Sequence, residues 1–314
     1  MLYIFTNKFD VSSQKIIFWL NRLKKEFKVL YTELKINQIN LEISNSRQQL
    51  FLETGDVIHD INLENDRFFY RRGSASYYHN LASIKGAAIE RFLQNETSTV
   101  ENFLDFIFLK QSNVKNRKEL NKLQILKLAS DIGINIPNTA VITSKKSLVD
   151  FFVKNNKQII IKPLYEGLNV RTKQGFLKTY TSQLNIEDID SLENYFSPTL
   201  IQSEVKKYVE IRSFYLKGEF YSMAIFSQKD SMTSIDFRNY NSDRPLKIAP
   251  FKLPLNLEGK LEKLFQNLRI DTGSIDLCLT PENKFVFLEI NPVGQYGMLS
   301  LCNYHLDRKL AEII

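Results

Sequence analysis

The sequence predicts an α/β protein of three lobes, in which helices and strands are mixed within each lobe. Apolar residues make up 43% of the 314 residues and aromatic residues 12%, which excludes a disordered chain and provides for several packed lobes. Helical and strand periodicities follow one another along the chain. Near the C-terminus, two apolar strands flank a turn. We place the lobes at residues 1–118, 119–198 and 199–314.

The N-terminal lobe is expected to begin with a strand over 1–6 and an amphipathic helix over 12–25. Helical patterns also occupy 82–94 and 99–109. Between these helices, short runs rich in β-branched and aromatic residues predict strands at 28–34, 39–44, 48–53 and 67–73. This lobe is therefore a small α/β unit followed by helices.

The central lobe is expected to alternate helix and strand. A helix opens at Asn121-Lys122-Leu123 and ends on Gly133, and an apolar strand over 158–162 carries Lys162 at its end. Residues 199–314 then supply an antiparallel sheet.

The hairpin of the C-terminal lobe carries the most specific chemical signal. Its strands, 275–279 and 285–290, are expected to send Asp276, Glu289 and Asn291 towards one end of the sheet. Two carboxylates and a carboxamide form an oxygen-only site, which suits Mg²⁺ when nucleotide phosphates complete its coordination. The alternative is that both carboxylates are ordinary solvated strand residues. Their positions inside apolar runs favour the cation, because a lone buried carboxylate is costly.

These residues, with the sequence FLEINPVGQ, resemble the magnesium-binding end of the ATP-grasp fold. Upstream, the segments NKL with Lys122, IIIKP with Lys162 and LIQSEVKKYVEIR follow in the family's order. Their sequence pattern is similar to that of the peptide-modifying ATP-grasp ligases, namely the graspetide (microviridin-type) synthetases and the grasp-with-spasm peptide maturases. The resemblance covers roughly residues 65–300 and implies three lobes, with the nucleotide between the central and C-terminal lobes.

The resemblance also assigns the nucleotide-binding residues. It implies that Lys122 and Lys162 hold phosphates, where lysine acts as a compact point charge. Arg212 would point at the same phosphates as a catalytic group, and Glu210 would accept from the ribose hydroxyls. The adenine edge would meet the backbone around Gln202, Ser203, Glu204 and Val205, and Asn291 would join the cofactor site as well as the metal site.

The same side chains have less specific interpretations. Lys162 at the end of a buried strand could simply reach solvent. Glu210 and Arg212 could form a cross-strand surface pair that adds little stability. The segment 164–169 fits a mobile loop over the triphosphate, yet its single glycine suits a plain turn equally well.

Two arginine-containing motifs resemble the peptide-modifying branch in particular. The sequence SIDFRNY contains Asp236 and Arg238 and is similar to that branch's D-W-R or D-F-R element. The resemblance implies that Arg238 binds the transferred phosphoryl group or the substrate carboxylate, and that Asp236 orients it or acts as a base. Arg71 and Arg72 follow the N-terminal strand in a Y-R-R pattern, and their alternative is a solvated pair at a strand end.

The function implied is an ATP-dependent ligase with ATP and two Mg²⁺ ions as cofactors. It would phosphorylate a side-chain carboxylate of a ribosomally made precursor peptide and let a hydroxyl or amine attack, giving ester or amide macrocycles. The peptide's leader would dock around 176–196, where an acidic helix start could instead only complement the helix dipole. The alternatives are a ligase acting on free amino acids or small acids, and a non-catalytic nucleotide-dependent peptide-binding module.

Composition narrows the partners and the compartment. The net charge of +7 is dispersed, and no zinc spacing, RNP-like motif or basic helix accompanies it, so we expect no nucleic acid partner. No apolar run approaches the roughly 18 residues of a membrane span, so we expect no membrane partner. The only two cysteines are Cys278 and Cys302, and Cys278 lies inside a predicted buried strand, so we expect no structural disulfide. This indicates a reducing compartment and hence the cytoplasm. A homodimer is compatible with the sequence, which does not fix the oligomeric state.

Overall fold

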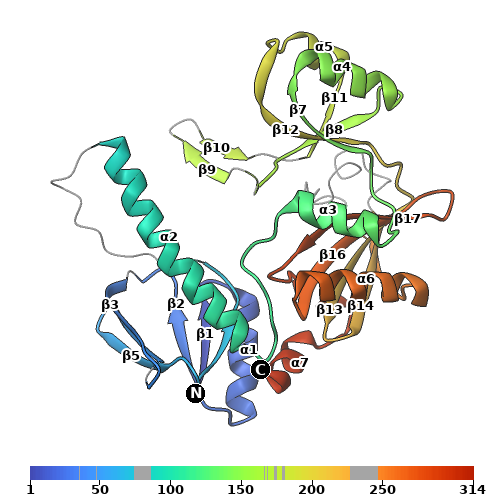
Figure 1. The fold of residues 1–314 in the computed structure, drawn as a ribbon. Coiled ribbons are helices and arrows are strands. Elements are labelled where there is room, and N and C mark those ends of the chain that lie inside the picture. Colours follow the sequence, from blue (N-terminus) through green and yellow to red (C-terminus); the bar gives the residue numbers. More distant parts are fainter. Residues whose placement is uncertain are drawn as a thin grey trace.

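The computed structural model describes residues 1–34, 36–46, 48–73, 86–165, 167, 169–172, 175–178, 181–226 and 247–314, with only the backbone course of 169–172 and 175–178. Figure 1 shows a blue N-terminal lobe, a green and yellow central lobe above, and an orange and red C-terminal lobe. The expected mixture of helices and strands is confirmed.

The N-terminal lobe is built on a parallel sheet in the order β2-β1-β6, with β1 in the centre. Its strands are Leu2–Thr6, Phe27–Tyr31 and Arg67–Tyr70. Helix α1 (Val11–Arg22) starts at the carboxyl end of β1, where Asp10 caps it by accepting a 3.0 Å hydrogen bond from the backbone N–H of Ser13. The carboxyl ends of all three strands therefore meet at one edge of this sheet.

The rest of this lobe differs from the expectation in two places. An antiparallel meander contains β3 (Ile36–Ile43), β4 (Gln48–Thr54) and β5 (Val57–Asn62), and the last strand was not predicted. The helices expected at 82–94 and 99–109 are wrong as separate elements. They form one 24-residue helix, α2 (Ala87–Lys110), because no glycine or proline lies between them to end the first.

The central lobe is a four-stranded antiparallel sheet in the order β11-β8-β12-β7, with helices on one face. Ile142, Leu148 and Phe152 belong to the core between the sheet and helix α4. A separate two-stranded hairpin, β9–β10, stands beside the sheet. The elements are β7 (Thr139–Ser144), α4 (Lys145–Lys154), β8 (Ile159–Lys162), β9 (Asn169–Thr172), β10 (Gly175–Lys178), β11 (Ser182–Leu184), α5 (Ile186–Asp190) and β12 (Tyr195–Ser203).

The C-terminal lobe is a five-stranded antiparallel sheet in the order β15-β14-β13-β16-β17. Helices α6 and α3 cover one face, and η1 and α7 cover part of the other, where α7 also packs on α1. Helix α3 lies within residues 119–198, which we assigned to the central lobe from the sequence. In the structure it packs on the C-terminal lobe instead. The elements are α3 (Lys122–Asp131), β13 (Val209–Leu216), β14 (Glu219–Phe226), β15 (Lys247–Phe251), α6 (Leu255–Leu268), β16 (Thr272–Leu279), β17 (Phe285–Asn291), η1 (Gly297–Cys302) and α7 (Leu306–Ile313).

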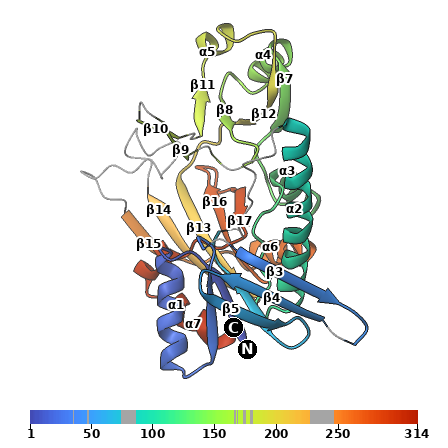
Figure 2. The same ribbon diagram turned by 90° about the vertical axis from the view of Figure 1, so that its left-hand side faces the viewer.

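The faces of this sheet explain where its charged residues lie. On β13, Ile211 belongs to the core beneath α6, whereas Phe214 packs on the opposite face. Alternation along the strand places Glu210 and Arg212 on the face of Phe214. Figure 2 shows the central lobe standing above this sheet.

Candidate functional site

A β-bulge shapes the predicted metal hairpin. Leu277 pairs with Phe287 and Asp276 pairs with Glu289, so Leu288 is the extra residue. Phe287 belongs to the core beneath α6, and strict alternation would send Glu289 to that same face. The bulge turns Glu289 to the side of Asp276 instead. Asn291 follows two residues later, so all three predicted ligands share the face that carries Arg212.

Arg212 is held by one of these ligands. Its Nε and Nη2 atoms lie 2.9 and 3.0 Å from the two carboxylate oxygens of Asp276, its register partner on β16. Both side chains are largely buried, which makes this bidentate pair a fixed part of the site. Each carboxylate oxygen accepts only one of these bonds, so lone pairs remain for a cation.

The donor set fits Mg²⁺ if phosphate oxygens complete it. Asp276 and Glu289 supply carboxylates and Asn291 an amide oxygen, all hard ligands. Among the described residues there is no group of three or more His, Cys, Asp or Glu side chains that could hold a metal ion by themselves. A dedicated protein cage is thus not seen in this part of the chain, and a shared protein and phosphate site is the arrangement magnesium usually takes.

The turn after Asn291 is tightly constrained. The Oδ1 atom of Asn291 accepts a 3.1 Å hydrogen bond from the backbone N–H of Val293, and its carbonyl accepts one of 3.1 Å from Gly294. Gly294 has a φ of +74°, and an added Cβ would lie 2.6 Å from the Cε2 atom of Phe214. Phe214 is fully buried, so it cannot easily move away.

We expect Gly294→Ala to lower the free energy of unfolding by on the order of 1–3 kcal/mol, the usual cost of overpacking a buried site, with a left-handed backbone penalty in addition. Gly55→Ala is the matched control, because its φ is +59° and no atom lies within 4 Å of the added Cβ. Urea denaturation of both variants separates the two effects. An equal loss in the two would show that the contact with Phe214 adds nothing.

The two predicted phosphate-binding lysines line one cavity between the central and C-terminal lobes. Lys162 ends β8 and Lys122 begins α3, whose N-cap Asn121 accepts from two backbone N–H groups. The Nζ atom of Lys122 donates to the carbonyls of Pro163 and Tyr165, at 3.0 and 2.5 Å. The cavity walls are formed by Lys122, Ile125, Leu126, Lys162, Leu200, Gln202, Phe287, Leu288, Glu289 and Ile290. The structure thus brings both lysines and Glu289 to one cleft.

The hinge after β12 is largely occupied by contacts within the central lobe. Backbone N–H groups of Ser203 and Glu204 donate to the carbonyls of Asn138 and Gln158, at 2.8 and 2.9 Å. The Glu204 carboxylate accepts from the Gln183 amide at 2.8 Å.

Gln202 differs from the other hinge residues, because one of its side-chain polar atoms has no partner in the described part of the chain. It is 1% exposed and donates to Thr139, but its amide oxygen has no hydrogen-bond partner among the described residues. Gln202 also lines the cavity. Val205, the last hinge residue, is half-buried.

Glu210 lies in a small charged group deeper on the same face. It is buried and accepts a 3.0 Å hydrogen bond from Lys207, and it pairs in register with Cys278. Burial raises the pKa of the Cys278 thiol to about 12, and Glu210 adds to the rise, while Lys207 and Lys162 oppose it. The thiol is therefore uncharged at neutral pH.

We expect Cys278 to resist alkylation in the folded protein. Since the thiolate is the reactive form and Cys278 is fully buried, its labelling by iodoacetamide at pH 8 should be at least tenfold slower than after unfolding in urea. Peptide mapping of the labelled protein measures this. Rapid native labelling of Cys278 would contradict the buried placement.

Two of the sequence predictions fall wholly or partly outside the described residues. Asp236 and Arg238 lie outside them, and so do residues 166 and 168 of the expected phosphate loop. Arg71 and Arg72 are described, and neither is a solvated residue at a strand end. Arg71 is 1% exposed, and Arg72 lies 3.7 Å from a carboxylate oxygen of Asp10.

Solved structures with this arrangement identify the fold. Macrocyclase MdnC from Microcystis aeruginosa MRC, bound with its precursor peptide MdnA, superposes with a TM-score of 0.77 and 22% identity, covering 99% of this chain and 98% of that one. A RiPP-associated ATP-grasp ligase from Chryseobacterium gregarium, in complex with ADP and a leader and core peptide, gives a TM-score of 0.77 and 20% identity, covering 100% and 94%. The chain has the ATP-grasp fold. The ATP-grasp fold that we predicted from the hairpin and lysine motifs is thereby confirmed.

Sequence comparison points to the same ATP-grasp fold. The α-aminoadipate–LysW ligase LysX of Sulfurisphaera tokodaii is 25% identical over 231 residues, which cover 69% of this chain and 76% of LysX. No family model matches the chain. None of the helices in the described part of the chain has the length and apolar content that crossing a membrane requires.

Proposed function

We propose that this ATP-grasp chain is an ADP-forming ligase that joins side chains of a ribosomally made precursor peptide. The observation that carries the proposal is the bulged hairpin, which pairs Asp276 with Glu289 at the cleft lined by Lys122 and Lys162. Glu289 lines the cleft with both lysines, and its register partner Asp276 adds a second carboxylate. Such a group suits a magnesium nucleotide, which carries both metal and phosphate charge.

Each residue has a defined part in this proposal. Asp276, Glu289 and Asn291 would hold two Mg²⁺ ions, which when bound offset phosphate charge and polarise the reacting phosphoryl group. Lys162 and Lys122 bind phosphate oxygens, and Arg212 fixes Asp276 while adding positive charge beside it. In the base and ribose part of the site, Gln202, Ser203, Glu204 and Val205 surround adenine and Glu210 accepts from ribose.

The chemistry proceeds in two steps. A peptide carboxylate oxygen attacks the γ-phosphorus of ATP, and ADP leaves, which gives an acyl phosphate. A hydroxyl or amine of the same peptide then attacks the acyl carbon, loses its proton to a base, and expels phosphate. One water equivalent is lost from the peptide for each ester or amide. Arg238 is our candidate for binding the phosphoryl group or carboxylate, and Asp236 for orienting it or taking the proton.

A peptide substrate is supported by the solved structures of similar fold, which contain a precursor peptide or a leader and core peptide. The leader would dock on the central lobe around 176–196. There Asp188 and Asn185 form a capping box, with hydrogen bonds of 3.0 and 2.8 Å, so Asp188 is already used by helix α5. Glu187 and Asp190 remain as the acidic groups for a leader. We place the enzyme in the cytoplasm, where ATP and newly made peptide are present, and propose that it forms a homodimer.

A second candidate follows from the similarity to LysX, which is named for joining α-aminoadipate to LysW. On this alternative, the chain would ligate a free amino acid or small acid. Its nucleotide chemistry would be unchanged, and only the acceptor and donor would differ.

An isotope-transfer experiment tests the proposed chemistry. A precursor peptide with heavy-oxygen-labelled Asp and Glu carboxylates is incubated with the protein, ATP and Mg²⁺, and the released phosphate is examined by mass spectrometry. The acyl-phosphate route transfers one labelled oxygen to phosphate for each bond formed. Product with unlabelled phosphate would exclude that route, and ligation of labelled free amino acids in place of the peptide would favour the second candidate.

A further inference from the structure

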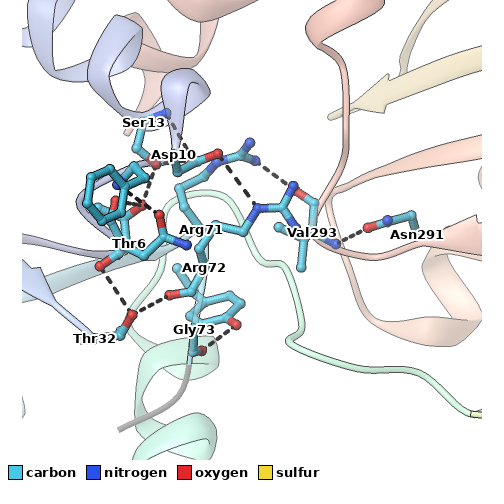
Figure 3. A network of polar contacts seen from close by, with 12 residues as sticks. Thr6, Asp10, Ser13, Thr32, Arg71, Arg72, Gly73, Asn291 and Val293 are labelled. Atoms are coloured by element: carbon cyan, nitrogen blue, oxygen red, sulfur yellow. Dashed lines mark hydrogen bonds and ion pairs between the residues drawn. The ribbon is translucent and has the colours of Figure 1, made fainter. Parts of the chain in front are cut away.

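Arg71 spans the junction between the N-terminal lobe and the metal hairpin (Figure 3). It follows β6, and its Nη1 atom donates a 2.7 Å hydrogen bond to the carbonyl of Val293, 222 residues away. The guanidinium carbon lies 6.0 Å from the ring centre of Phe69 and 5.1 Å from that of Tyr296. With 1% exposure, Arg71 is buried between these rings and the turn after β17.

Arg71 bonds to Val293, and Val293 in turn orients the predicted metal ligand Asn291. The carbonyl of Val293 accepts from Arg71, and the N–H of Val293 donates to the Oδ1 atom of Asn291. Fixing Val293 therefore fixes the direction of the Asn291 amide oxygen. That oxygen accepts one bond from Val293 and keeps a second lone pair for a cation.

Arg71 is itself anchored where the three parallel strands end. Its backbone N–H donates to the carbonyl of Phe5 at 2.7 Å. The hydroxyl of Thr32 donates to the carbonyls of Thr6 and Arg72, both at 3.3 Å, and Asp10 lies 3.7 Å from the Nε atom of Arg72. The carboxyl ends of β1, β2 and β6 are thus tied together behind Arg71, as Figure 3 shows.

Stability alone does not explain an arginine here. Its Nε and Nη2 atoms are buried and have no hydrogen-bond partner among the described residues. Unpaired buried donors are costly, so an apolar side chain of similar length would suit packing between Phe69 and Tyr296 better. The bond to Val293 is what such a side chain would lose.

We infer that Arg71 is a positioning residue, which holds the turn 291–294 so that Asn291 stays directed at the magnesium nucleotide. The inference rests on the proposed function, because it needs a metal at the hairpin. Groups that orient metal ligands typically change metal affinity by about 10- to 100-fold when they are removed.

Calorimetry with the non-hydrolysable analogue AMPPNP tests the inference without any turnover. We expect Arg71→Met to raise the Mg²⁺ concentration for half-maximal tightening of AMPPNP binding by about tenfold, the lower end for such orienting groups. Affinity for AMPPNP in EDTA should be unchanged. Arg71→Lys, which keeps the charge and a donor, should recover part of the effect. Arg67→Met on the same strand is the control, because Arg67 is exposed and, among the contacts described, its side chain donates only to Gln111 and Asn65.

A double variant shows whether Arg71 acts through Asn291. Asn291→Ala should reduce magnesium coupling by itself, and adding Arg71→Met should reduce it no further. Additive losses would overturn the inference, as would an Arg71→Met protein with a lower melting temperature but wild-type magnesium dependence. Should Arg71→Met fail to fold, Arg71→Lys is measured in its place. Normal melting with weakened magnesium coupling would support the inference, and a lowered melting temperature with wild-type coupling would overturn it. AMPPNP binding that ignores Mg²⁺ in the wild-type protein would instead overturn the proposed function.

Discussion

Glu289→Ala is expected to abolish ADP and product formation while leaving the fold intact. The carboxylate lies at the cleft, opposite Asp276, where it would hold Mg²⁺, and its removal takes one of two carboxylates from the donor set. Glu289 is half-buried and contributes no apolar core surface, so the variant should melt close to the wild-type temperature. Coupled-enzyme detection of ADP and circular dichroism measure the two quantities.

The matched control for this variant lies on the same hairpin. Glu282 occupies the exposed turn between β16 and β17, away from the cleft. Glu282→Ala should keep full turnover. If Glu289→Ala turned over ATP at the wild-type rate, the assignment of the metal site would be wrong.

Lys162→Met is expected to weaken ATP or ADP binding by on the order of 1–3 kcal/mol, the range for hydrogen bonds to charged groups, or about 5- to 150-fold. Methionine preserves most of the side-chain volume and removes only the charge. Lys122→Met should show a similar loss. In addition it should loosen the residues after β8, because the Nζ atom of Lys122 holds the carbonyls of Pro163 and Tyr165.

Calorimetric titration with ADP checks this prediction. Lys154→Met serves as the control, since Lys154 is exposed in the last turn of α4 on the same lobe. Wild-type ADP affinity in both Lys162→Met and Lys122→Met would require the nucleotide site to be placed elsewhere.

The elements that carry the site could be predicted because their signals are local. The periodicity of α3 and the apolar run of β8 place Lys122 and Lys162 without knowledge of the tertiary structure. The hairpin was predicted from its two apolar strands and turn. Its bulge at Leu288 was not, because an extra residue leaves no mark in an apolar run.

Contacts between residues far apart in the chain could not be predicted from the sequence. The bond of Arg71 to Val293 joins residues 222 positions apart, and the Y-R-R pattern reads equally well as a solvated strand end. Likewise, the pairing of Arg212 with Asp276 depends on the register of β13 and β16, whereas the sequence predicted only that Arg212 points at phosphates. That role remains a prediction.

The most direct measurement of the central claim is the mass of a precursor peptide after incubation with the protein, ATP and Mg²⁺. The peptide encoded beside this gene, with its leader attached, should lose the mass of one water for each ring formed, and ADP should appear in equal amount. The loss should vanish with Glu289→Ala and persist with Glu282→Ala. An unmodified peptide, together with ADP formation that depends on added free amino acids, would contradict the claim.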